Sequence, residues 1–186
     1  MTPSCTYCGA GTRLAFVAND RNRGLSTEQF PYYTCVGCGF TFLSPVPDDL
    51  GRFYGDDYYA LPKDSLTLAT QAASEVYKAD LVEQWAPGKR LLEVGPAVGG
   101  FACLAKQRGF EVTAIEMNQQ CCDFLNNVVG IRALHSTDTD ATLKTVGTFD
   151  MVALWHVIEH FRDPWVTLAG WVHYLAFDLF TGAWIV

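Results

Sequence analysis

Residues 91 to 101 read LLEVGPAVGGF, an apolar run with one acid that breaks at a Gly- and Pro-containing turn and continues as a helix-like pattern. This strand-turn-helix step constrains the fold most, because similar steps follow it. The strand-like segments RLLEV, EVTAIE, IRALH and FDMVALW alternate with the helix-like segments FACLAKQR and NQQCCDFLNNV. Strands alternating with helices of about ten residues indicate parallel β-α-β units. We therefore predict an α/β domain with a doubly wound, mainly parallel sheet over residues 66–186.

Further elements are expected on both sides of this pattern. Apolar residues at roughly helical spacing predict a helix over residues 66–85. Asp163 and Pro164 suit the N-cap and first position of a helix that runs to about Phe177. GAWIV, residues 182–186, would be a fifth strand. An apolar edge strand without charge or proline is a template for pairing, so we expect self-association through it.

Two C-x2-C-G knuckles occupy the start of the chain, with Cys5 and Cys8 in one and Cys35 and Cys38 in the other. Four thiolates presented by two tight turns make a tetrahedral Zn²⁺ site. The paired spacing disfavours two disulfides or a redox C-x-x-C motif. TRLAFVA and EQFPYYTC, between the knuckles, are predicted strands. We predict a zinc ribbon over residues 1–45, in which a structural ion supplies much of the folding free energy.

Residues 46–65 form a connector rich in Pro, Gly, Asp and Tyr. Its four aromatic residues are too many for a solvated linker, so we expect them to pack against the following domain. They are Phe53, Tyr54, Tyr58 and Tyr59.

Composition limits the partners. The formal net charge is −7 and no basic run occurs, so neither nucleic acid nor an anionic membrane is an expected partner. The start MTPSCTYCG lacks a basic and an apolar segment, so no secretory signal is visible and a cytoplasmic location is expected. Residues 165–186 are apolar, but His173 and Asp178 make a membrane span costly, and a helix plus a strand is the better interpretation.

The turn after the first strand of the α/β domain can be compared with the dinucleotide pattern G-x-G-x-x-G. Gly95, Ala97 and Gly100 fit it with the middle glycine replaced, and Glu116 lies where the ribose-binding acid belongs. A pyrophosphate, however, needs backbone N–H donors and positive potential. Pro96 removes a donor, and Glu93 adds a carboxylate.

These features suit a ligand with a cationic amino-acid end and an unphosphorylated ribose. Glu93 would favour the ammonium group, and Glu116 would accept hydrogen bonds from both ribose hydroxyls. S-adenosylmethionine is such a ligand. A tight strand-to-helix turn without any ligand is the alternative that the residues leave open.

The chain resembles the class I S-adenosylmethionine-dependent methyltransferases that carry an N-terminal zinc ribbon. The resemblance rests on Glu93-Val-Gly95-Pro-Ala97-Val-Gly99, on Glu116, on Asp150 at the fourth strand, and on SPVP and FYGDDYY in the connector. It implies a Rossmann-like sheet that would continue past the fifth strand, so we expect the domain to be partial. The cofactor-binding residues that it implies are Glu93, Gly95, Pro96, Ala97, Gly99, Glu116, Met117 and Trp155.

The resemblance also has a departure, at Ala97, where the family more often has Gly. A methyl group there is expected to be tolerated only if φ stays negative.

WHVIEH, residues 155–160, has three interpretations. As H-x-x-E-H it matches an inverted zinc-protease motif, which the preceding strand and the following Asp-Pro disfavour. The resemblance instead puts His156 beside the transferred methyl group, where an imidazole can remove the acceptor's proton. Some relatives with this motif bind a divalent ion, so a metal role for His156, Glu159 and His160 stays open. For Glu159 and His160 we prefer a purely structural role.

We therefore expect an enzyme that transfers a methyl group from S-adenosylmethionine to an O, N or C nucleophile of a small molecule or sugar-type metabolite. His156 is the predicted catalytic residue. The alternative is a binding or scaffold protein in which a zinc ribbon and a Rossmann-like domain recognise a partner without chemistry.

Overall fold

The computed structural model describes residues 2–21, 24–49, 51–55, 58–175 and 184–185. The chain divides into two compact units, Met1–Tyr58 and Tyr59–Val186. Among the described residues, no helix has the length and apolar character needed to cross a membrane.

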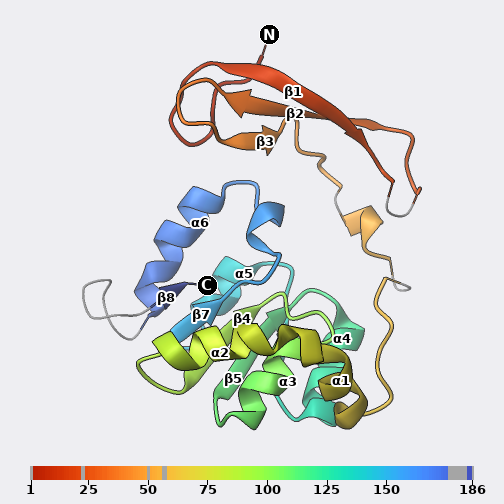
Figure 1. The fold of residues 1–186 in the computed structure, drawn as a ribbon, viewed down its shortest axis with the longest axis vertical. Helices are drawn as coiled ribbons and strands as arrows, with labels where there is room; N and C mark the ends of the chain where they lie inside the picture. The colour runs from red at the N-terminus through yellow and green to blue at the C-terminus, as the bar shows by residue number, and fades with distance from the viewer. Residues whose placement is uncertain (1, 22–23, 50, 56–57, 176–183, 186) are drawn as a thin grey trace. The chain divides into compact units, whose positions relative to one another are not determined.

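The first unit is a small antiparallel sheet (Figure 1). Its strands are β1 (Thr12–Asn19), β2 (Gln29–Cys35) and β3 (Thr41–Leu43), in the order β1-β2-β3. The pairing of β1 with β2 shifts register between Leu14 and Phe16. The two predicted strands are confirmed, whereas β3 was not predicted because its three residues are too few to show an alternating pattern.

The connector contains a short 3-10 helix, η1 (Gly51–Phe53). The ring of Phe53 lies edge-on to Phe30 of β2, at a centroid distance of 6.1 Å. Tyr54 and Tyr58 pair with each other at 5.0 Å. Phe53 thus packs within the first unit, whereas we expected it to pack against the following domain.

The second unit contains the predicted parallel sheet. Its strands are β4 (Arg90–Val94), β5 (Glu111–Glu116), β6 (Arg132–His135), β7 (Met151–Ala153) and β8 (Trp184–Ile185). They lie in the order β6-β5-β4-β7-β8, and every neighbouring pair is parallel. The α/β, Rossmann-like fold is therefore confirmed.

Helical segments connect these strands. The longer ones are α1 (Ser65–Gln71), α2 (Val76–Trp85), α3 (Gly100–Gln107), α4 (Gln119–Phe124), α5 (Thr139–Leu143) and α6 (Pro164–Trp171). Shorter turns are η2 (Ala72–Glu75), the π-helical η3 (Leu125–Val129), η4 (Ile158–His160) and η5 (Val172–Tyr174). The predicted helix over 66–85 is thus two α-helices joined by a 3-10 turn.

The last helix begins as predicted, because Asp163 Oδ1 accepts a hydrogen bond from the Val166 N–H at 3.0 Å. Phe177, its expected end, lies outside the described residues. So do Gly182, Ala183 and Val186 of the expected fifth strand, of which β8 is the described part.

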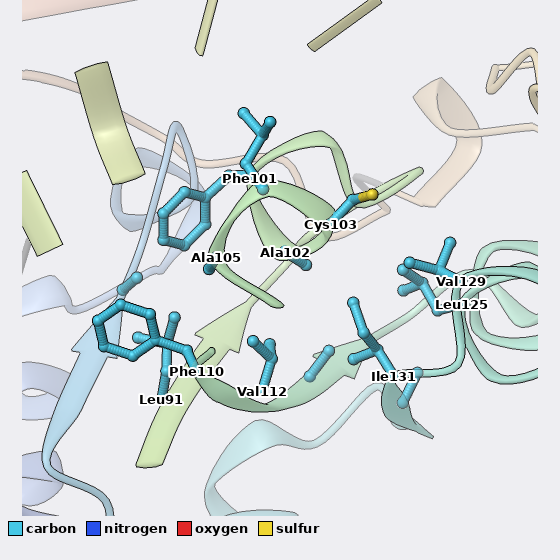
Figure 2. Packing of buried hydrophobic residues seen from close by; sticks show 14 of the residues in the cluster. Leu91, Phe101, Ala102, Cys103, Ala105, Phe110, Val112, Leu125, Val129 and Ile131 are labelled. Atoms are coloured by element: carbon cyan, nitrogen blue, oxygen red, sulfur yellow. The ribbon is translucent and has the colours of Figure 1, made fainter. Parts of the chain in front are cut away.

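Alternating side chains of the sheet enter two cores. Leu91 belongs to the core beneath α1, α2, α3 and α4, and Leu92 belongs to the core on the other face, with α5 and α6. Figure 2 shows the first core, in which Ala102 and Ala105 of α3 lie over the strands and face Val112. Helices on both faces bury the central strands β4 and β5 except for their first residues, Arg90 and Glu111, which explains why their sequences are apolar runs.

Candidate functional site

The carboxyl end of β4 lies at the switch point of the sheet. From β4, the chain adds β5 and β6 on one side and β7 and β8 on the other. In doubly wound sheets, ligands bind outside the strand ends at this point. The turn over residues 95–99 occupies it, as the sequence predicted.

Two glycines of the turn are required by its geometry. Gly95 has φ of +68°, and a Cβ added there would lie 2.6 Å from Cγ2 of Val157. Gly99 has φ of +83°, and its added Cβ would lie 2.3 Å from Cδ2 of Leu125. Pro96, between them, is buried. The segment after β7 is thus packed directly onto the turn.

Ala97 corrects one expectation, because its φ is +54° rather than negative. A left-handed conformation costs an L-residue roughly 1–2 kcal/mol. In this conformation the Ala97 N–H donates to Oε2 of Glu116 at 2.9 Å. A charge-assisted hydrogen bond of this kind offsets much of that cost. The neighbouring strand β5, which ends at Glu116, therefore allows an alanine to occupy this position.

Glu116 ends β5 and is 2 % exposed. Besides the bond from Ala97, its Oε1 accepts from the Asn118 N–H at 2.8 Å. Each carboxylate oxygen keeps a second lone pair for a ligand donor. Glu116 therefore organises the turn in addition to facing the site, a role that the sequence did not indicate. Met117, the next residue, is exposed, and its carbonyl is paired with His135 Nε2 at 2.9 Å.

Glu93 is the most unusual polar residue of the site. It lies within β4, is 3 % exposed, and its Oε2 is buried without a hydrogen-bond partner. Burial raises the pKa of Glu93 to about 8; Lys78 opposes this rise, and Glu75 and Glu116 add to it. A buried carboxyl oxygen without a partner is costly, which indicates that a ligand donor belongs there.

Lys78 is a site residue that the sequence analysis missed. It is 7 % exposed, its Nζ donates to Oε2 of Glu75 at 2.9 Å, and it lies 5.2 Å from the ring centroid of Trp155. A lysine on a helix is normally solvated, which hid it. The sequence could have indicated its burial, because Lys78 precedes the buried Val82 by one helical turn and therefore lies on the same face of the helix.

Trp155 follows β7 and joins this cluster. Its ring lies edge-on to Phe101 at 5.4 Å and to Tyr77 at 6.4 Å. Its Nε1 is buried and has no hydrogen-bond partner. The predicted cofactor residues Trp155 and Glu93 are thus linked through Lys78, and both carry a polar atom that nothing in the described structure satisfies.

His156, the predicted catalytic residue, has φ of +57° and an exposed side chain. A non-glycine residue in this region is strained, and such strain concentrates at functional sites. The metal-binding interpretations of WHVIEH are not supported. Ile158–His160 is one 3-10 turn, and in the described part of the chain only the four cysteines bring three or more His, Cys, Asp or Glu ligand atoms together.

Those four cysteines form the second candidate site, in the first unit. Their Sγ atoms all lie within 4.8 Å of one another, with Cys5 to Cys38 at 3.8 Å and Cys8 to Cys35 at 3.5 Å. A tetrahedral Zn²⁺ with Zn–S bonds of about 2.3 Å requires S to S distances of about 3.8 Å. A disulfide requires about 2.05 Å. The cysteines are free, and their spacing fits zinc.

The two knuckles have the same backbone geometry. The Gly9 N–H donates to the Cys5 carbonyl at 2.9 Å, and the Gly39 N–H donates to the Cys35 carbonyl at 3.2 Å. Hydrogen bonds from the N–H groups of Cys38 and Gly37 lower the pKa of Cys35 to about 6 against the opposing effect of burial. This favours the thiolate that a metal ion needs.

The cofactor site passes a test of fit. S-adenosylmethionine carries an ammonium group, a carboxylate and a ribose diol. The chain offers the unpartnered Glu93 for the first, the buried Lys78 for the second and Glu116 for the third. No phosphate is needed, in agreement with the acidic character of the cluster.

Comparison with known proteins gives one family. The model of a methyltransferase domain matches residues 69–176, more than half of the chain. A comparison with curated proteins finds no match. The match confirms the family that the motifs predicted.

Several solved structures are similar. A SAM dependent methyltransferase from Archaeoglobus fulgidus is 23 % identical, with a TM-score of 0.43 over 57 % of this chain and 49 % of its own. The N-terminal domain of EvdMO1 with SAH bound is 25 % identical, with a TM-score of 0.44 over 70 % and 52 %. The amino pentose methyltransferase CalS10 from Micromonospora echinaspora is 20 % identical, with a TM-score of 0.43 over 59 % and 47 %. This chain therefore spans about half of their length, and the family assignment rests on the domain match.

Proposed function

The chain belongs to the methyltransferase-domain family, and we propose that it transfers a methyl group from S-adenosylmethionine to a small-molecule acceptor. The observation that carries this proposal is the unpartnered Oε2 of Glu93, buried beside a turn whose other neighbour is Glu116. A site that places two buried acidic side chains, Glu93 and Glu116, and the partly exposed Glu75 around one lysine suits a cationic ligand better than a phosphate.

Each polar residue has a distinct part in the proposed binding. Glu93 accepts a hydrogen bond from the cofactor's amino group, and Lys78 faces its carboxylate. Glu116 accepts from the ribose hydroxyls while it holds Ala97 in place. Trp155 and Phe101 supply an apolar wall. The cofactor itself contributes a sulfonium-bound methyl group, which a nucleophile displaces in line.

The protein's own catalytic contribution is positioning and proton removal. His156 has a strained backbone and precedes Val157, whose side chain packs onto the turn. From there its imidazole takes the proton of an O–H or N–H acceptor as the methyl group arrives. An acceptor that is already deprotonated would not need this step, so the acceptor atom decides how strongly the rate depends on His156.

The ribbon is proposed to bind one structural Zn²⁺ through Cys5, Cys8, Cys35 and Cys38. The S to S distances and the matched knuckles support it. The charge of −7 and the absence of a basic run support an acceptor other than nucleic acid and no association with an anionic membrane.

Calorimetric titration with S-adenosylmethionine tests the proposal. Binding in the micromolar range with one ligand per chain is expected for a methyltransferase. A folded, zinc-loaded sample that binds neither S-adenosylmethionine nor S-adenosylhomocysteine would instead be the scaffold protein. Mass spectrometry of a small-molecule extract incubated with protein and methyl-labelled cofactor would then identify the acceptor by its mass gain.

A further inference from the structure

The surroundings of Glu93 combine several acidic groups with a single cation. Its neighbours are Glu75 on η2, Glu116 at the end of β5 and Lys78 on α2. Three carboxyl groups and one ammonium give a formal charge of −2 if all are ionised. Such a cluster is unfavourable when it is buried, unless one carboxyl keeps its proton.

Lys78 does not neutralise Glu93 by a direct contact. Its Nζ is bonded to Glu75 at 2.9 Å, and Glu93 Oε2 has no hydrogen-bond partner. Glu116 instead accepts hydrogen bonds from the N–H groups of Ala97 and Asn118. Glu93 has neither kind of support, so among the three carboxyl groups it is the one that holds a proton.

We propose that cofactor binding at this site exchanges a proton with solvent through Glu93, so that affinity for S-adenosylmethionine depends on pH. The inference rests on the proposed function and adds to it a regulation of the same site. In the free protein, the carboxyl of Glu93 is protonated at neutral pH. When the cofactor's ammonium group arrives, the carboxyl releases its proton to solvent and pairs with the ammonium as a carboxylate.

The sign of the exchange follows from two groups. The raised pKa of Glu93, about 8, is caused mainly by burial. The ammonium group of a free amino-acid end, which lies beside its own carboxylate, keeps its proton at pH 7. At pH 7 the Glu93 carboxyl is also about nine-tenths protonated. The ammonium-carboxylate pair keeps only one of the two protons, so binding releases nearly one. At pH 9 the Glu93 carboxyl is already mostly deprotonated in the free protein, so this release disappears. The affinity therefore rises as the pH increases from 7 towards 8.

Calorimetry measures this exchange directly. The wild-type chain is titrated with S-adenosylhomocysteine, which has the same amino-acid end and transfers nothing, in two buffers of different ionisation enthalpy at pH 7 and at pH 9. The dependence of the binding heat on the buffer gives the number of protons. We expect release of nearly one proton at pH 7 and no release at pH 9, where the Glu93 carboxyl has already lost its proton in the free protein.

Variants assign the proton. Glu93→Gln keeps the shape of the side chain and should reduce the release at pH 7 to near zero. Glu111→Gln, an exposed position at the opposite end of β5, should leave the release unchanged. With the wild-type chain, methylthioadenosine, which lacks the amino-acid end, should exchange no proton at pH 7. This second probe keeps the test valid even if Glu93→Gln fails to fold.

The outcomes separate this inference from the proposed function. Binding of S-adenosylhomocysteine without proton exchange at pH 7 overturns the inference and leaves the methyltransferase in place. Proton release by methylthioadenosine, or unchanged release in Glu93→Gln, also overturns it, because another group then titrates. No binding at any pH overturns the proposed function, and the inference with it.

Discussion

The two units of this chain are stabilised in different ways. Among the described residues of Met1–Tyr58, only Cys5 and Cys35 are buried, and large apolar side chains such as Leu14 and Phe16 are about half exposed. The second unit buries apolar residues on both faces of its sheet. A unit with so little apolar burial cannot fold by the hydrophobic effect alone. We therefore expect the first unit to depend on a metal ion bound by its four cysteines, whereas the second is stabilised by its core.

Removal of the metal ion is expected to have the largest effect on the stability of the first unit, and it tests the difference between the two units. Structural zinc contributes about 10–16 kcal/mol in zinc-finger peptides, so loss of the ion should unfold the first unit. Cys35→Ser should bind no zinc by metal analysis, and proteolysis should cut within the first 58 residues while the second unit resists. Cys103→Ala, a buried cysteine of α3, is the matched control and should keep one zinc per chain. Wild-type protein purified without chelator and found free of zinc would contradict the prediction.

A core substitution should show the opposite behaviour. Leu92 is fully buried in the face of the sheet shared with α5 and α6. Leu92→Ala should lower the free energy of unfolding of the second unit by about 2–5 kcal/mol, measured by urea denaturation, with zinc content unchanged. Leu66→Ala, at a position 77 % exposed, should change it by less than about 0.5 kcal/mol. Zinc loss in Leu92→Ala would show that the two units do not fold independently.

The affinity for the cofactor should depend on Glu116 of the second unit. Glu116→Ala removes the acceptor for the ribose hydroxyls and for the Ala97 N–H, and should weaken S-adenosylmethionine binding by roughly 1.5–3 kcal/mol. Glu111→Ala, at the other end of the same strand, is the control and should bind normally in the same titration. Unchanged affinity in Glu116→Ala would mean that the end of β5 does not contact the cofactor.

The smallest expected change in stability is that of His156→Gly, which separates stability from activity within the second unit. His156→Gly removes a side chain from a backbone at φ of +57°, so the free energy of unfolding should stay the same or rise by up to about 1 kcal/mol. Methyl transfer to an O–H or N–H acceptor should fall roughly 100-fold or more. His160→Ala should leave the transfer rate unchanged. A loss of stability in His156→Gly would show that the imidazole makes a structural contact.

Sequence patterns were sufficient for the parts of the fold that repeat. Apolar runs that alternate with helical patterns located β4, β5 and β6, because strands buried on both faces are continuous apolar runs. Residue type and spacing also predicted the two knuckles. Both kinds of signal are local, so they survive without knowledge of the tertiary structure.

The features that could not be predicted from the sequence depend on contacts made in the folded structure. The positive φ of Ala97 is compatible with a methyl group only through Glu116, 19 positions away. Lys78 is buried because Glu75 and Trp155 accommodate it. Val76 and Leu81, two of the apolar residues in the predicted helix over 66–85, are 37 % and 39 % exposed, and the 3-10 turn η2 interrupts that helix just before Val76. No residue in these windows encodes its distant partner.

The pairing of β4 with β7 has a consequence for the order of events during synthesis. The Asp150 carboxylate accepts from the Arg90 backbone N–H at 2.9 Å, across 60 positions, and fixes one side of the strand that carries Glu93. The ribosome must therefore release residue 150 before the cofactor turn is supported from both sides. The cysteine cluster needs only residues 5 to 38. A nascent chain can thus capture metal well before it can bind a nucleoside, and the two capacities arise in that order.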